Sequence, residues 1–300
     1  MQLRAAAFAS PKSDPPSLRW PPDVADLFQD ARTPPEITPA DLSVDTLRSG
    51  VLRHGCLLVR GLIPMRRVNQ LVQDIDRAFD AFDQQSTGGS QSDWFVPFDP
   101  GAGRDELVPR AWVRGSGGVL AVDSPPSFFD LLETFDEVGA RELIGGYLAE
   151  PPVILAAKVT LRRMRLSELT KTVPIEDRDF HQDGAFMGAG IRSLNMWISL
   201  SHCGEDAPGL DLVPCRFDEI VDAGTGGAAF SWSVTAANAE RASRDGVVSP
   251  VFAPGDALFF DHFLLHRTKL EPGMTKDRHA IEAWFAAASS YPSDQVPIVY

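Results

Sequence analysis

A histidine and an aspartate, His181 and Asp183, flank Gln182 in the stretch FHQDGAF, residues 180–186. Imidazole and carboxylate groups are common ligands of divalent metals, so this pair could supply two-thirds of a metal site. A lone histidine is more often a satisfied residue of the core. A metal site here therefore requires a third ligand from another part of the chain.

The best candidate for the third ligand is His266, in the segment PGDALFFDHFLLHRT at residues 254–268. His262 lies four residues earlier, and on a helix the two would form a metal-binding pair. The Pro-Gly-Asp start and the crowded apolar residues instead favour a single strand over 257–266. In a strand only His266 reaches the metal, and His262 is a pocket or packing residue. The remaining histidines are expected to be superficial or structural: His54, His202 and His279.

Arg278 follows His266 by twelve residues and opens the segment RHAIEAWF. Two antiparallel strands joined by a loop would bring His266 and Arg278 together. Two histidines and one carboxylate leave three positions of an octahedral iron open, enough for a bidentate 2-oxo acid and dioxygen. The fork of Arg278 matches the distal carboxylate of such an acid, and the hydroxyl of Thr268 could donate to the same group.

Two further residues could border a 2-oxo acid. Trp197 shares one face of the segment SLNMWISL with Asn195 and Ser199 by the period-2 rule, and is bulky enough to form a wall. Lys158 lies in the apolar run VILAAKVTL, where a buried ammonium needs an anionic partner or loses its charge. It could contact the 2-oxo acid, but it could equally emerge at a strand edge.

The elements that must position these residues change character near residue 150. Before it, the patterns predict helices at 41–55, 63–85, 126–135 and 137–149, a buried strand at 56–62 and long loops at 84–125. After it, turns separate short strands, and this predicts a sandwich or barrel. We therefore expect an α+β domain with a mainly β core. The expected strands are 153–164, 178–183, 193–201, 210–213, 250–253, 257–266 and 278–286.

The chain divides into two expected parts. Residues 1–40 are rich in proline, which lacks a donor and fixes φ, and predict an extended arm. Residues 41–300 form a single domain, helix-rich over 41–150 and mainly β over 151–300. An insertion at 216–249, expected to be partly helical, and the loops at 84–125 would supply the pocket walls.

The motifs together resemble the phytanoyl-CoA dioxygenase family of iron(II)/2-oxoglutarate oxygenases, over roughly residues 40–290. The segments that carry the resemblance are FHQD, MWISL, PGLDLVP, GDALFFDHFLLHRT, RHAIEAWF and the earlier GCLLVRGLIPMRRVNQLVQDI. The resemblance implies a double-stranded β-helix, or jelly roll, with helices packed on one sheet. It also implies Fe²⁺ on His181, Asp183 and His266, and 2-oxoglutarate held by Arg278 and Thr268 near Trp197. The chain departs from the family at Cys215-Arg216-Phe217, where Gly-Ser-His is common, and at Ala280, which is often serine.

The expected activity is that of a dioxygenase that hydroxylates, or otherwise oxidises, an unactivated C–H bond of a small molecule. 2-Oxoglutarate and O2 are consumed, and succinate and CO2 are formed. Relatives that halogenate have a small residue at the carboxylate position, so Asp183 predicts hydroxylation and not halogenation. The alternatives are a non-catalytic jelly-roll protein that binds a metal or ligand and, with less support, a zinc hydrolase, which leaves Arg278 and Thr268 without a role.

Bulk composition excludes several classes of partner. The formal net charge is −13, whereas nucleic-acid binding and attachment to anionic membranes need a basic face. Three cysteines, Cys56, Cys203 and Cys215, are too few and too far apart for a disulfide framework or a structural zinc site. With no apparent signal or spanning segment, the expectation is a cytoplasmic protein acting on a small molecule, of undetermined oligomeric state.

Overall fold

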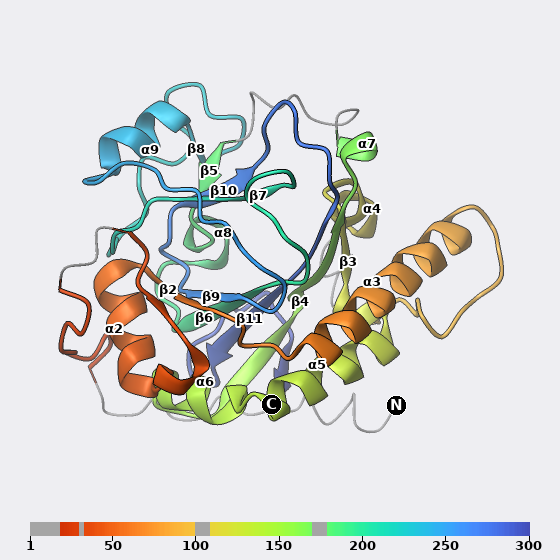
Figure 1. The fold of residues 1–300 in the computed structure, drawn as a ribbon, viewed down its shortest axis with the longest axis horizontal. Helices are drawn as coiled ribbons and strands as arrows, with labels where there is room; N and C mark the ends of the chain where they lie inside the picture. The colour runs from red at the N-terminus through yellow and green to blue at the C-terminus, as the bar shows by residue number, and fades with distance from the viewer. Residues whose placement is uncertain (1–18, 30–32, 100–108, 170–178) are drawn as a thin grey trace.

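The computed structural model describes residues 19–29, 33–99, 109–169 and 179–300. Two β-sheets face each other, and helices cover the outer face of the larger sheet (Figure 1). The mixed α+β architecture predicted from the sequence is thus present. The expected proline-rich arm lies in large part outside the described residues. The part near residue 36 contributes a short strand, β1 (Glu36–Ile37), which pairs in parallel with β2 (Cys56–Val59).

Most pairs in the larger sheet are antiparallel, and β11 lies near its centre between β4 and β6. Each long strand alternates its side chains between the helix-covered face and the face toward the smaller sheet. The same strands therefore give the sheet two faces with different side chains. In spatial order its strands are β1, β2, β9 (Ala257–Phe260), β6 (Ser193–Ser199), β11 (Arg278–Ala287), β4 (Pro152–Met164) and β12 (Pro297–Val299), with β3 (Gly118–Leu120) also paired to β4.

Four helices bury their apolar stripes against the outer face of this sheet (Figure 1). In α2, Ser43 caps the N-terminus by accepting from the backbone of Thr46, and Gly55 ends the helix in the left-handed region. In α3 the side chains of Val68, Leu71 and Ile75 recur at helical spacing and are buried. The four helices are α2 (Val44–His54), α3 (Met65–Ser86), α5 (Pro125–Glu137) and α6 (Ala140–Leu148).

The smaller sheet has the spatial order β7-β10-β5-β8, and an apolar cluster joins it to the inner face of the larger sheet. Its strands are β7 (Gly209–Leu212), β10 (His266–Lys269), β5 (Phe180–His181) and β8 (Ser233–Val234). The short helices among the described residues are η1 (Pro39–Asp41), α4 (Arg110–Gly115), η2 (Ala121–Asp123), α7 (Leu166–Leu169), α8 (Gly184–Met187) and α9 (Ala236–Ala242).

Three expectations about local structure were wrong. The apolar run 257–266 is not one strand, because Asp261 accepts from the backbone of Phe263 and Leu264 and turns the chain between β9 and β10. His266 and Arg278 do not lie on paired strands, since β10 belongs to the smaller sheet and β11 to the larger one. Residues 84–125 are not only loop, because they contain α4, β3 and η2.

Other expectations were confirmed with shifted bounds. The strands predicted at 153–164, 193–201 and 278–286 are present as β4, β6 and β11, and the insertion 216–249 contains α9. One further expectation was wrong, because the predicted strand 250–253 contains only an isolated bridge between Phe252 and Cys203. Among the described residues, no helix is long and apolar enough to cross a membrane.

Candidate metal centre

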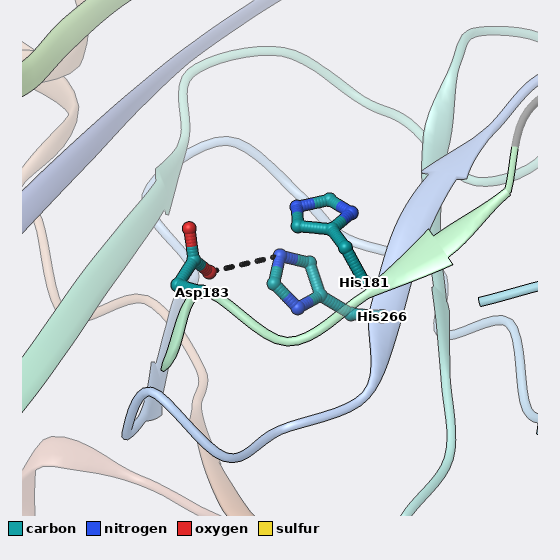
Figure 2. A group of neighbouring side chains, drawn as sticks. All are labelled: His181, Asp183 and His266. Atoms are coloured by element: carbon teal, nitrogen blue, oxygen red, sulfur yellow. Dashed lines mark ion pairs between the residues drawn. The ribbon is translucent and has the colours of Figure 1, made fainter. Parts of the chain in front are cut away.

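His181, Asp183 and His266 converge from two neighbouring strands of the smaller sheet (Figure 2). The register places His181 of β5 opposite His266 of β10, and Asp183 follows β5 by two residues. One ligand atom from each residue can be chosen so that all three lie within 4.8 Å of one another. The two imidazole ring centroids are 4.4 Å apart, and His266 Nε2 lies 3.7 Å from Asp183 Oδ2. This spacing suits a single metal ion bound by all three side chains.

The surroundings of these atoms also fit a cation. His266 Nδ1 lies 3.0 Å from the carbonyl oxygen of Leu264, to which it donates in the tautomer that leaves Nε2 as a free ligand atom. Asp183 is only 4% exposed, and its Oδ2 atom has no hydrogen-bond partner among the described residues. A buried carboxylate oxygen without a donor is costly unless a cation binds it.

Burial sets the protonation of the same groups. Desolvation, reinforced by neighbouring His266, holds the pKa of His181 well below its usual range, so the imidazole is neutral, as a metal ligand must be. Burial also raises the pKa of Asp183 to about 6, against the opposing effect of His266. A bound cation would favour the ionised form of this carboxylate and reverse that shift.

Gln182, the residue between the candidate ligands His181 and Asp183, fixes the loop that carries them (residues 181–183, the metal loop). Its side chain is fully buried and its Nε2 donates to the carbonyl oxygens of Phe263 at 2.8 Å and Glu219 at 3.1 Å. Its Oε1 accepts from the backbone N–H of Val221 at 2.7 Å. The metal loop is thereby tied both to the segment that leads into His266 and to the insertion 216–249. Sequence reasoning treated Gln182 as a spacer and missed this role.

His262 is not part of the group. Its Nδ1 lies 2.8 Å from the hydroxyl of Ser193, its Nε2 lies 3.2 Å from the carbonyl oxygen of Ala189, and its ring packs against Gly184. A Cβ atom on Gly184 would approach His262 Cδ2 and Ile220 Cδ1 to 3.0 Å, so a side chain here would require these neighbours to move. The prediction that His262 is a packing residue is confirmed.

The three convergent side chains lie on the wall of a cavity of about 420 Å³ between the two sheets. The two regions expected to form its walls, 84–125 and 216–249, contribute lining residues between Trp112 and Leu120 and between Ala229 and Ser233. Every residue that the sequence proposed for metal or cosubstrate contact lines this one cavity: Lys158, His181, Asp183, Trp197, His266, Thr268 and Arg278.

Arg278 and Trp197 occupy one side of the cavity. The Arg278 side chain is 3% exposed, donates from Nη1 to the carbonyl oxygen of Gly209 at 3.0 Å and lies 5.8 Å from the centre of the Trp197 ring. Thr268 stands two residues past His266 on β10 and also faces the cavity. A buried guanidinium and a hydroxyl that line the same cavity are both able to donate to a carboxylate.

Lys158 lies on β4 with its ammonium 4.3 Å from the centre of the Phe186 ring. Burial lowers its pKa, although Asp183 and Glu282 oppose that shift. It forms no ion pair with any residue in the described part of the chain. Of the two readings left open by the sequence, the structure favours a lysine directed into the cavity over one at a strand edge.

An ion pair that the sequence did not reveal crosses the cavity wall. Arg162 Nη2 of β4 lies 2.8 Å from Glu282 Oε2 of β11, and Arg162 Nη1 also donates to the hydroxyl of Ser116 at 3.2 Å. Burial works to raise the pKa of Glu282, but Arg162 outweighs it and holds that pKa at about 2. Strand periodicity could have located both residues, since Arg162 shares a face with Lys158 and Glu282 shares a face with Arg278.

Comparison with known proteins supports the fold. No protein-family model matches the chain, and no curated protein matches it in sequence. AviO1 from Streptomyces viridochromogenes Tue57 is 18% identical, with a TM-score of 0.51 over 83% of this chain and 96% of AviO1. EctD from S. alaskensis, solved with 2-oxoglutarate and 5-hydroxyectoine, is 14% identical, with a TM-score of 0.54 over 82% of this chain and 75% of EctD. The chain thus shares the fold of these proteins, one of which was solved with 2-oxoglutarate.

Proposed function

We propose that the protein is an iron(II)- and 2-oxoglutarate-dependent oxygenase of the phytanoyl-CoA dioxygenase type. Residues 41–300 would form its single jelly-roll domain. The observation that carries the proposal is the convergence of His181, Asp183 and His266 on the wall of the same cavity as Arg278 and Thr268. Two histidines and one carboxylate on one face are the ligand set of non-haem iron(II) oxygenases. The fold shared with EctD, solved with 2-oxoglutarate, supports the same assignment.

Each of the remaining residues has a role in binding. Arg278 would hold the distal carboxylate of 2-oxoglutarate, assisted by Thr268, while Trp197 would limit the space around it. Lys158 would contribute positive charge toward the anionic cosubstrate. Bound iron, with 2-oxoglutarate and O2, supplies the oxidising power, and 2-oxoglutarate becomes succinate and CO2. The protein orients the substrate carbon and keeps water from the cavity.

The reaction proposed is hydroxylation, or a related oxidation, of an unactivated C–H bond in a small molecule. Asp183 would supply a third protein ligand and so would fill the position that a halide needs in a halogenating enzyme. Two other functions could use the same three side chains, but each leaves part of the site without a purpose. A non-catalytic binding protein has no need for open coordination positions on the metal, and a zinc hydrolase has no need for Arg278 and Thr268.

The test is succinate formation. Iron(II)-loaded protein, incubated with 2-oxoglutarate, O2 and candidate substrates, is expected to form succinate, slowly even without the correct substrate. The same assay compares Arg278→Ala, which is expected to need more 2-oxoglutarate, with the exposed Lys276→Ala as its matched control. Both cations lie near the start of β11. If the unmutated protein binds iron but forms no succinate, the oxygenase proposal is wrong and the binding-protein alternative stands.

A further inference from the structure

Aromatic side chains gather on the rim of the cavity where solvent reaches it. Phe186 is 38% exposed, Phe230 53% and Trp112 59%, and all three line the cavity together with the half-buried Trp232. Large aromatic groups left in contact with water lose the stabilisation that burial would give them. Their concentration around one opening, with a metal site below it, is typical of a ligand-binding surface and not of scattered surface residues.

The geometry within this group is specific. The rings of Phe230 and Trp232 are parallel to within 1°, with centroids 4.8 Å apart. The Trp232 ring is nearly perpendicular to those of His181 and Phe186, with ring centroids 5.7 Å and 5.6 Å apart. Phe230 therefore forms the outermost layer of a stack that reaches the first metal-ligand candidate.

The stack is held in position by residues next to the metal loop. Asp179 accepts from the backbone N–H of Ala229 and from the hydroxyl of Ser233, both at 2.7 Å. β8 pairs with β5, with Ser233 opposite His181. Because the insertion is tied on both sides of Phe230 and Trp232, a ring packed on Phe230 has a defined position relative to the metal ligands.

We infer that the substrate carries a flat or alicyclic ring, which packs on the exposed face of Phe230 while the carbon to be oxidised enters the cavity. The inference rests on the proposed function for the fate of that carbon, but ring binding itself does not require iron. The parallel pair offers a third ring the offset-stacked geometry that aromatic groups prefer, and offers the C–H face of an alicyclic ring a broad apolar surface.

The test uses 1-anilinonaphthalene-8-sulfonate as a fluorescent ring-bearing probe on the full chain. Phe230→Leu, which keeps apolar bulk but removes the ring, is expected to weaken probe binding about three- to tenfold. The matched control is Phe129→Leu, a 60% exposed phenylalanine of α5 that does not line the cavity, and it should leave probe binding unchanged. Equal binding by the two variants, or no binding by the unmutated protein, overturns the inference.

A competition experiment tests the requirement for a ring. Naphthalene-1-sulfonate is expected to displace the probe at a concentration at least about fivefold lower than octane-1-sulfonate, which has the same charge and no ring. Equal displacement by the two compounds would contradict the ring assignment. Cobalt(II) absorption measured on the same samples separates this inference from the proposed function. If cobalt(II) fails to bind while the probe behaves as expected, the metal proposal fails and the ring site stands.

Discussion

The two faces of the larger sheet share strands and hydrogen-bond register but serve different purposes. On β11, Ile281, Ala283 and Phe285 point toward the helices and are fully buried in an apolar cluster. Arg278 and Glu282 alternate with them and line the cavity. Strand periodicity thus assigns stability to one face and chemistry to the other, with no need for separate structural elements.

Buried charges make the difference sharper. On the helix face, Arg163 is 2% exposed and its Nη1 atom lies 3.1 Å from carboxylate oxygens of both Asp76 and Asp80 on α3. On the cavity face, Lys158 has no ion-pair partner among the described residues and lies over an aromatic ring. A buried charge that the protein itself neutralises belongs to the fold, whereas a buried charge without a protein partner indicates a binding site.

The largest expected effect lies on the helix face. Phe285→Ala removes a fully buried ring and should lower the free energy of unfolding by about 3–5 kcal/mol, because a cavity remains where the ring packed. Phe129→Ala, at an exposed position, should cost less than about 0.5 kcal/mol. Chemical denaturation measures both. A small effect at Phe285 would show that the helix face is not the stabilising one.

On the cavity face the corresponding change should affect binding. Arg278→Ala is expected to weaken 2-oxoglutarate binding by about 2–5 kcal/mol, since one partner of a buried charged contact is lost, and to leave iron binding nearly unchanged. The dependence of succinate formation on 2-oxoglutarate concentration measures this, with Lys276→Ala as the control. Normal saturation of the Arg278 variant would refute its assigned role.

Gln182→Met tests the link between the metal loop and the insertion. The substitution keeps the side-chain volume but removes three hydrogen bonds and leaves backbone groups of Phe263, Glu219 and Val221 without their partner. We expect a loss of about 1–3 kcal/mol in unfolding free energy, together with weaker iron binding. Gln84→Met, at an exposed position of α3, should change neither quantity. Unaltered iron affinity in the Gln182 variant would show that the ligands need no such support.

The smallest expected effect returns to the helix side, between α3 and α5. Burial and neighbouring Asp130 raise the pKa of Asp74 to about 7. The folded protein therefore binds a proton on the Asp74 carboxylate more tightly than the unfolded chain does. The contribution of this proton to the free energy of unfolding is complete below about pH 4 and is lost as the pH rises toward 7. Asp74→Asn should remove about 1–2 kcal/mol of the fall in stability between pH 5 and pH 8. Thermal unfolding at the two pH values measures it, and an unchanged pH dependence would argue against the assignment.

The sequence predicted which side chains line the cavity better than it predicted strand pairing. A local motif indicated His181 and Asp183, an apolar run indicated Lys158, and period-2 alternation indicated Trp197 and Thr268, because all three signals depend only on nearby residues. The predicted pairing of β10 with β11 was wrong. Antiparallel pairing is the simplest arrangement of two consecutive strands, and no local signal shows that the chain crosses from one sheet to the other. The stacked Phe230 and Trp232 were missed for a similar reason, since their meaning depends on what lies beside them in space.

The proposed function requires His181, Asp183 and His266 to hold one iron ion together. Anaerobic equilibrium dialysis of iron(II) against the unmutated protein, Asp183→Ala and the exposed Asp206→Ala tests it directly. We predict one iron per chain for the unmutated protein and for the Asp206 variant. For Asp183→Ala we predict affinity weakened by more than about 100-fold, because loss of a ligand should cost more than loss of its outer-shell support. Iron binding by Asp183→Ala at the unmutated level would contradict the account.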